Sequence, residues 1–171
     1  MKICILSDSH DNRESLQLAI EQAKEWGAEC ILHCGDVVSA YTLRVLFKYE
    51  IPIHAIHGNN AGDIPVLSKM SHDPANPIHY YGQDAALELG GRKIFLVHYP
   101  HYAEGLALTG DWDLVCCGHD HQLHIEQYTT IKGGTTWLVN PGTVAGMGGA
   151  PATYVLADLE TMSFEPRTME L

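Results

Sequence analysis

The sequence predicts a single α/β domain in which two mixed β-sheets pack together and helices cover their outer faces. In the first 60 residues, short apolar runs alternate with amphipathic segments in the order β-α-β-α-β. The second half instead carries many short apolar runs separated by glycine turns, which favours a second sheet. A length of 171 residues allows one domain with a substantial core and is short for two, so we expect residues 1–171 to form one unit.

The first half begins with a continuous apolar run over residues 2–7, which is typical of a strand buried on both faces. Apolar residues then recur at helical spacing as far as Gly27, and Asp11 with Glu14 predicts an acidic cap at the start of that helix. The same reasoning predicts a strand over residues 29–33, a helix over 41–49 and a strand over 51–57.

The second half is predicted to contain more strands than helices. Gly90-Gly91 lies between two apolar runs, 85–89 and 93–97, and indicates a hairpin. Residues 71–77 are rich in turn formers and indicate a loop. The other expected elements are short helices over 63–70 and 104–108, a strand over 113–117, and closing strands over 123–130, 136–139, 153–159 and 162–167.

Composition and charge narrow the function classes. Ten basic against 21 acidic residues give a net charge of -11, which repels nucleic acid and anionic membranes at long range. No apolar run is long enough to cross a bilayer, and the early polar turn at Ser7-Asp8 argues against a secretory signal, so the expected location is the cytoplasm. The five cysteines lie in apolar runs without a CxxC pair, which predicts reduced, buried thiols.

Five polar clusters each follow a strand-like run, at the strand ends where open α/β sheets bind their ligands. They are Asp8-Ser9-His10, Gly35-Asp36, Gly58-Asn59-Asn60, His98 and Gly118-His119-Asp120-His121. Each cluster alone is weak evidence for a metal site. Together the clusters offer carboxylate, carboxamide and imidazole groups and no thiolate. That set suits two borderline-hard divalent metals side by side, a common device for cleaving phosphate esters.

The side chains of these clusters suffice for two metal sites with open positions for water and phosphate. The carboxylate of Asp36 can bridge two metals through its two oxygens, and Asn59 is a neutral ligand that preserves Lewis acidity. The seven expected metal ligands are Asp8, His10, Asp36, Asn59, His98, His119 and His121.

In this order, the clusters resemble the calcineurin-like metallophosphoesterase superfamily, and the chain length with the loop 140–143 resembles its small bacterial and archaeal phosphodiesterase branch. The resemblance spans residues 2 to about 167. It implies a four-layer α/β/β/α sandwich and a dinuclear metal-dependent phosphoesterase that acts on phosphodiesters rather than monoesters. It also implies that the first metal is held by Asp8, His10, Asp36 and His121, and the second by Asp36, Asn59, His98 and His119.

The chain departs from the family pattern beside the ligands. Many members have histidine where this chain has Asn60, and a Gly-His pair where it reads Tyr99-Pro100-His101. We expect a hydroxide that bridges the metals to attack phosphorus in line, with Asn60 donating a hydrogen bond to a phosphoryl oxygen. The leaving oxygen would take its proton from His101 or from a metal-bound water. Tyr99 and Tyr102 are expected to form the wall of the substrate pocket.

The expected cofactors are two divalent ions, manganese first, with nickel, zinc or iron as alternatives. The expected partner is a small phosphoester, and a homodimer is a family-level expectation. A non-catalytic scaffold on the same fold is the alternative, because the scaffold subunit of the eukaryotic retromer resembles this branch. A scaffold can lose ligands, whereas all seven positions here carry competent residue types. Asn140 and Thr143 are expected to brace the floor of the site, and His33 to pack behind it.

Overall fold

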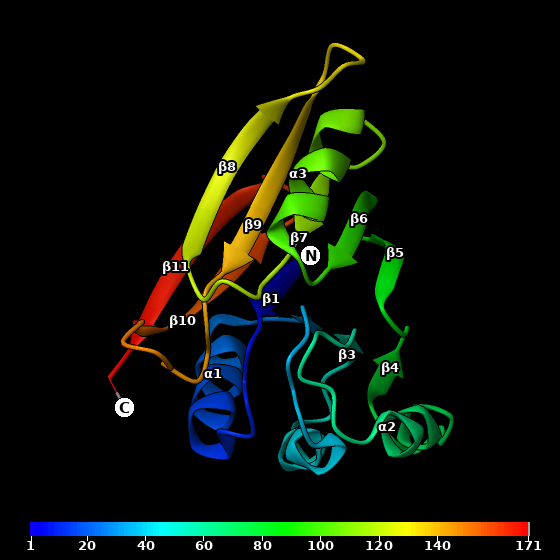
Figure 1. The fold of residues 1–171 in the computed structure, drawn as a ribbon, viewed down its shortest axis with the longest axis vertical. Coiled ribbons are helices and arrows are strands. Elements are labelled where there is room, and N and C mark those ends of the chain that lie inside the picture. The colour runs from blue at the N-terminus through cyan, green and yellow to red at the C-terminus, as the bar shows by residue number, and fades with distance from the viewer. Residues whose placement is uncertain (171) are drawn as a thin grey trace.

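The computed structural model describes residues 1–170 and has the four layers that the sequence predicts (Figure 1). The six-stranded sheet has the order β11 (Ser163–Met169), β10 (Ala152–Asp158), β1 (Lys2–Leu6), β2 (Cys30–His33), β3 (Ile53–Ala55) and β4 (Ile78–Tyr80). The five-stranded sheet has the order β5 (Asp84–Leu89), β6 (Arg92–Val97), β7 (Leu114–Cys116), β9 (Thr135–Pro141) and β8 (Leu123–Thr129). The helices are α1 (Arg13–Trp26), the 3-10 helix η1 (Ala40–Tyr49), α2 (Ile64–Ser71) and α3 (Pro100–Thr109).

Side chains alternate along the central strands and thereby divide the core into three layers. In β1, Cys4 and Leu6 pack with α1, η1 and α2, while Ile3 and Ile5 face the second sheet. In β7, Leu114 faces the first sheet, and its neighbour Val115 packs under α3. Both sheets are therefore buried on two faces near their centres, which explains why their strands read as continuous apolar runs.

The parallel strands at the centre of each sheet position the polar clusters. Strands β1, β2, β3 and β4 run parallel, and β6, β7 and β9 run parallel in the second sheet. Antiparallel strands lie only outside these groups, as β10 and β11, β5 and β8. The loops after β1, β2, β3, β6 and β7, which carry all five clusters, consequently leave the two sheets at one common edge.

Most predicted elements are confirmed, and the differences have local causes. The N-cap of α1 is Asn12, whose side chain accepts from the Ser15 N–H, so the predicted acidic cap is wrong. Asp11 instead accepts from the Ser39 N–H and the Thr42 hydroxyl, which join the first loop to η1. Strand β4 was not predicted, because three residues after a turn-rich loop carry too little periodicity.

Helix α3 is longer than the predicted residues 104–108 and begins at Pro100. Proline is favoured in the first turn of a helix, since its missing N–H has no helical partner there. Pro100 therefore starts the helix four residues earlier than predicted, and it places His101 on the first turn of α3.

Burial of the cysteines is as predicted: Cys4, Cys30, Cys34, Cys116 and Cys117 are all buried and unpaired within the described residues. No helix in residues 1–170 combines the length and the hydrophobicity that crossing a bilayer requires.

Candidate metal centre

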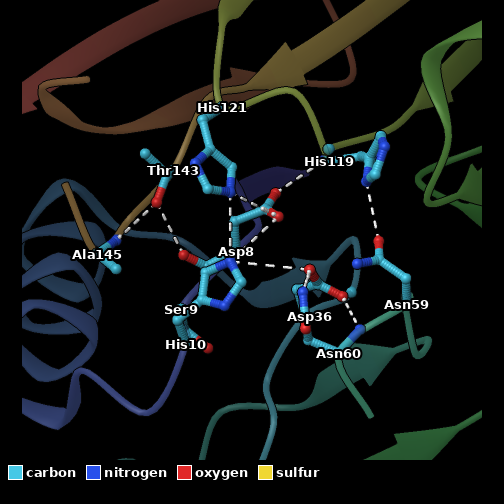
Figure 2. A network of polar contacts seen from close by, with 12 residues as sticks. Asp8, Ser9, His10, Asp36, Asn59, Asn60, His119, His121, Thr143 and Ala145 are labelled. Atoms are coloured by element: carbon cyan, nitrogen blue, oxygen red, sulfur yellow. Dashed lines mark hydrogen bonds and ion pairs between the residues drawn. The ribbon is translucent and has the colours of Figure 1, made fainter. Parts of the chain in front are cut away.

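The structure brings the predicted ligands from both sheets together at the common edge (Figure 2). Asp8, His10 and His121 form one group whose ligand atoms all lie within 4.8 Å of one another. Asp8 Oδ1 lies 3.4 Å from His121 Nε2 and 3.7 Å from His10 Nε2, and the two imidazole nitrogens are 3.2 Å apart. These atoms come from two loops 111 positions apart in the sequence, and they belong to three of the four residues expected to hold the first metal.

A second group surrounds Asp36. Asp8, Asp36 and His98 also bring ligand atoms within 4.8 Å of one another, and His98 Nε2 lies 3.4 Å from Asp36 Oδ1. Asn59 Oδ1 lies 3.1 Å from His98 Nε2 and 2.8 Å from His119 Nδ1. Asp36 lies between the groups, because its other oxygen is 3.7 Å from His10 Nε2.

His98 is held so that one particular nitrogen faces this site. Its Nδ1 lies 2.8 Å from the Cys34 carbonyl oxygen, which can only accept, so Nδ1 carries a proton. Burial disfavours protonation of the ring, but the Asp36 carboxylate and the Cys34 carbonyl outweigh burial and raise the pKa of His98. Nε2 therefore lies among oxygen atoms that attract positive charge, which is a suitable position for a cation.

Asp36 is kept ionised by its neighbours. Burial opposes ionisation, but hydrogen bonds from His98 and from Asn60 outweigh it and hold the pKa of this carboxyl well below its usual range. Asn60 donates through its backbone N–H to Oδ1 at 2.8 Å and through its side chain to Oδ2 at 2.7 Å. The Asn60 amide thus orients Asp36, a contact that was not predicted from the sequence.

One buried oxygen atom, Oδ1 of Asp8, shows whether the group formed by Asp8, His10 and His121 fits a cation. Among the described residues, Asp8 is fully buried and its Oδ1 has no hydrogen-bond partner. A buried carboxylate oxygen without a partner is costly. Asp8 Oδ2 accepts from the His119 N–H at 2.9 Å, so the carboxylate is oriented with Oδ1 toward His10 and His121. A divalent cation would satisfy this oxygen, and the residues therefore fit the predicted metal.

The backbone of the ligand loops is strained. Five predicted ligands have positive φ although they are not glycine: Asp8 at 54°, His10 at 40°, Asp36 at 56°, His119 at 78° and His121 at 62°. Each such residue costs on the order of 1–3 kcal/mol and persists only where its surroundings impose it. Strain concentrated on five ligands indicates that the loops are shaped for their side chains' positions.

The glycines of the clusters are needed for close packing. A Cβ added to Gly35 would lie 2.5 Å from His98 Nδ1, and one on Gly58 would lie 2.5 Å from His98 Nε2. A Cβ on Gly118 would lie 2.5 Å from Asp8 Oδ2. These glycines allow the loop backbones to pass directly against the ligands.

This geometry agrees with the family comparisons. The model of the calcineurin-like phosphoesterase superfamily domain matches residues 1–162. The chain belongs to this superfamily. A phosphodiesterase of Methanocaldococcus jannaschii is 29% identical over 173 residues, which cover 99% of this chain and 100% of the relative. Membership in the superfamily makes the chain a metal-dependent phosphoesterase.

Three solved structures share this fold along 99% of the chain. An archaeal phosphodiesterase superimposes with a TM-score of 0.88 at 27% identity, covering 99% of this chain and 100% of that one. A phosphoesterase from E. coli gives a TM-score of 0.68 at 21% identity, with coverage of 99% and 100%. Vacuolar protein sorting 29 from Cryptosporidium parvum gives 0.65 at 18% identity, with coverage of 99% and 97%. The last two likenesses show the fold alone.

The floor of the calcineurin-like site is braced, as predicted, by the last residues of β9 and the loop that follows it. Thr143 donates to the Asp8 carbonyl at 2.9 Å and accepts from the Ala145 N–H at 3.2 Å (Figure 2). Asn140 donates to the Gly118 carbonyl at 3.0 Å and to Asp120 Oδ1 at 2.8 Å. These bonds connect the first and last ligand loops.

Tyr99 and His101 lie on the side of the site formed by His98 and His119. The Tyr99 ring packs edge-on against His98 and His119, with centroids 5.3 Å and 4.8 Å away. His101 is exposed and packs on Tyr102 and Tyr99, with centroids 4.1 Å and 5.7 Å away, one ring removed from the ligands. The roles predicted for Tyr99 in substrate binding and for His101 as an acid remain predictions.

His33 is packed behind the site, as expected. Its Nδ1 accepts from the Gly35 N–H at 3.3 Å, so Nε2 carries the proton and donates to Ser9 Oγ at 3.0 Å. The side chain is fully buried, and burial, reinforced by the nearby His98 ring, lowers the pKa of His33 from 6.5 to about 3.

His33 is expected to make folding stability depend on pH. Between pH 6.5 and about 3, His33 is protonated in the unfolded chain but neutral in the folded protein. The free energy of unfolding therefore falls as the pH falls through this range. The loss is on the order of 5 kcal/mol when complete. Urea unfolding with a chelator present, at several pH values between about 7 and 4, measures it.

The variant His33→Gln keeps a donor for Ser9 and is expected to show a shallower decline. His124→Gln, at an exposed position on β8, is the matched control and should keep the wild-type slope. Parallel pH profiles for His33→Gln and the wild type would contradict the assignment.

Proposed function

We propose that the protein hydrolyses phosphodiester bonds with two divalent cations held at the common edge of its sheets. The single observation that carries the proposal is the convergence of seven competent ligands from five loops, with an unpartnered buried oxygen on Asp8. The similar phosphodiesterase of Methanocaldococcus jannaschii supports the diester preference.

The contacts support a division of the ligands between two cations that share Asp36. Its Oδ2 faces His10 and its Oδ1 faces His98, so one carboxylate reaches both groups. The proposed first cation is held by Asp8, His10, Asp36 and His121, and the second by Asp36, Asn59, His98 and His119.

When bound, the two cations supply Lewis acidity that neutralises phosphate oxygens and activates a water for attack. The protein's part is to hold the ligands and the substrate. Asn60 keeps the Asp36 carboxylate in its bridging orientation, and its exposed position also lets the amide reach a phosphoryl oxygen. His101 is the proposed proton donor on the Tyr99 side, with water as the alternative. Manganese is the proposed metal, because carboxylate and amide oxygens suit it, and the imidazole ligands leave nickel, zinc or iron as alternatives.

The proposal is tested by metal content and turnover together. Protein freed of metal by a chelator is expected to be inactive, and titration with Mn²⁺ should restore hydrolysis of bis(p-nitrophenyl) phosphate at two ions per chain. The monoester p-nitrophenyl phosphate should be a poorer substrate, as judged by kcat/KM.

The alternative, a non-catalytic scaffold, predicts a different result in the same experiment. A protein that binds one ion or none and hydrolyses neither ester would overturn the proposal and favour a binding module. That reading rests on the likeness to vacuolar protein sorting 29, which is one of fold alone.

A further inference from the structure

A cavity of about 550 Å³ borders the candidate metal centre. It lies between α3 and β6, and His98 and Gly58 form part of its lining. The volume is within the range of about 300–1,000 Å³ that is typical of small-molecule sites. Since His98 faces both the cavity and Asp36, a molecule with its phosphate at the metal centre can extend directly into this space.

The cavity exists because one helix covers only part of the second sheet. Helix α3 packs against β9, β7 and β6, whereas β5 lies beyond it at the sheet edge (Figure 1). Phe95 and Val97 of β6 line the cavity from the sheet, and Tyr102 and Leu106 line it from α3. The space is thus a gap between two packed elements, with apolar and aromatic side chains on both of these walls.

Flat rings dominate the end of the cavity nearest the metals. Tyr99 closes that end and is fixed by its edge contacts with His98 and His119. Tyr102 is 56% exposed, a large apolar area for a side chain that lines a cavity. Aromatic faces in such a position favour a planar aromatic ligand, which gains stacking energy with little loss of conformational entropy.

Charge restricts the ligand further. Among the described residues that line the cavity there is no lysine or arginine, and Asp84 lies at its exposed rim beside Gln83. At this rim, an anionic group would meet the Asp84 carboxylate with no lysine or arginine among those lining residues to offset it, in a chain of net charge -11. A neutral group with polar edges would find the Gln83 amide and water.

We propose that this cavity binds one ester arm of the substrate and that this arm is an uncharged aromatic group. The inference rests on the proposed function, since it assigns the phosphate to the metal centre and the arm to the cavity. It makes Tyr102 and Asp84 specificity-determining residues, one selecting for a ring and the other against a negative charge.

The test uses two non-hydrolysable probes, phenylphosphonate and methylphosphonate, whose binding to the manganese-loaded protein is measured by calorimetry. Phenylphosphonate is expected to bind at least about tenfold more tightly. Tyr102→Ala should weaken phenylphosphonate about fivefold and leave methylphosphonate unchanged. Tyr41→Ala, at an exposed tyrosine of η1 outside the cavity, is the matched control and should change neither affinity.

A negatively charged probe tests whether Asp84 selects against anionic ligands. 4-Carboxyphenylphosphonate should bind more weakly than phenylphosphonate, and Asp84→Asn should recover most of the difference. Equal affinities of the three phosphonates, or a Tyr102→Ala loss shared by phenyl and methyl probes, would overturn the inference.

Binding and turnover separate this inference from the proposed function. Hydrolysis of diesters without a preference for the phenyl probe overturns the cavity assignment alone. A Tyr102-dependent phenyl preference without hydrolysis upholds the cavity and overturns the catalytic proposal. If neither phosphonate binds the metal-loaded protein, both are overturned.

Discussion

Asp36→Asn is expected to lower kcat/KM for bis(p-nitrophenyl) phosphate by about a thousandfold. Bound cations supply several kcal/mol of transition-state stabilisation, and each ~1.4 kcal/mol corresponds to tenfold in rate. The substituted amide would keep the shape of the side chain and a hydrogen bond from the Asn60 N–H, but it would lose the charge that both groups of ligands share. Metal analysis should show fewer than two ions per chain.

The control for this variant is Asp111→Asn, which removes an exposed carboxylate paired with Lys132 outside the candidate site. It should keep both the wild-type metal content and the wild-type rate. An Asp36→Asn protein that holds two ions and turns over normally would contradict the bridging role proposed for Asp36.

Gly58→Ala is expected to lower metal affinity and activity by about a hundredfold, because a displacement of about 1 Å in a catalytic group has that effect. The new Cβ would overlap Asp36 Oδ1 and lie 2.5 Å from His98 Nε2, so two ligands must move. The free energy of unfolding should fall by about 1–3 kcal/mol, since the new Cβ crowds the buried Asp36 and His98 side chains. Manganese titration, steady-state kinetics and thermal unfolding measure the three quantities.

Gly134→Ala is the matched control, because its Cβ would meet only Thr130 Oγ1 at 3.8 Å and its φ is not positive. It should match the wild type in metal affinity and rate. If Gly58→Ala behaves in the same way, the close approach of this loop to the ligands is not needed for metal binding.

The fold was largely predictable because its strands are either buried on both faces or separated by clear turns. The hairpin around Gly90-Gly91 was found for that reason, and both glycines have positive φ, at 56° and 73°. The local sequence did not predict the helix cap correctly where two neighbouring residues could both serve as the cap. Asn12 rather than Asp11 caps α1, because Asp11 is drawn to Ser39 and Thr42, partners supplied by a distant loop.

The residues around the ligands were harder to predict than the ligands themselves. The direct contacts of Asn60 are with Asp36, 24 positions earlier, and nothing in the Gly-Asn-Asn pattern indicates that orientation. Phe95 carried no signal for a cavity, since an apolar residue in a strand is expected in the core. Its role emerges only because α3 leaves part of the sheet uncovered.

The sequence by itself determined which side chains are available for metal binding and that each follows a strand. Those properties are local, since they depend on residue type, apolar runs and the order of the clusters. Only the tertiary structure decided which atoms meet. His98 presents Nε2 because the Cys34 carbonyl, 64 positions away, holds its Nδ1. The cavity beside the site likewise exists only where α3 and β6 pack, since contacts between distant segments leave no local pattern in the chain.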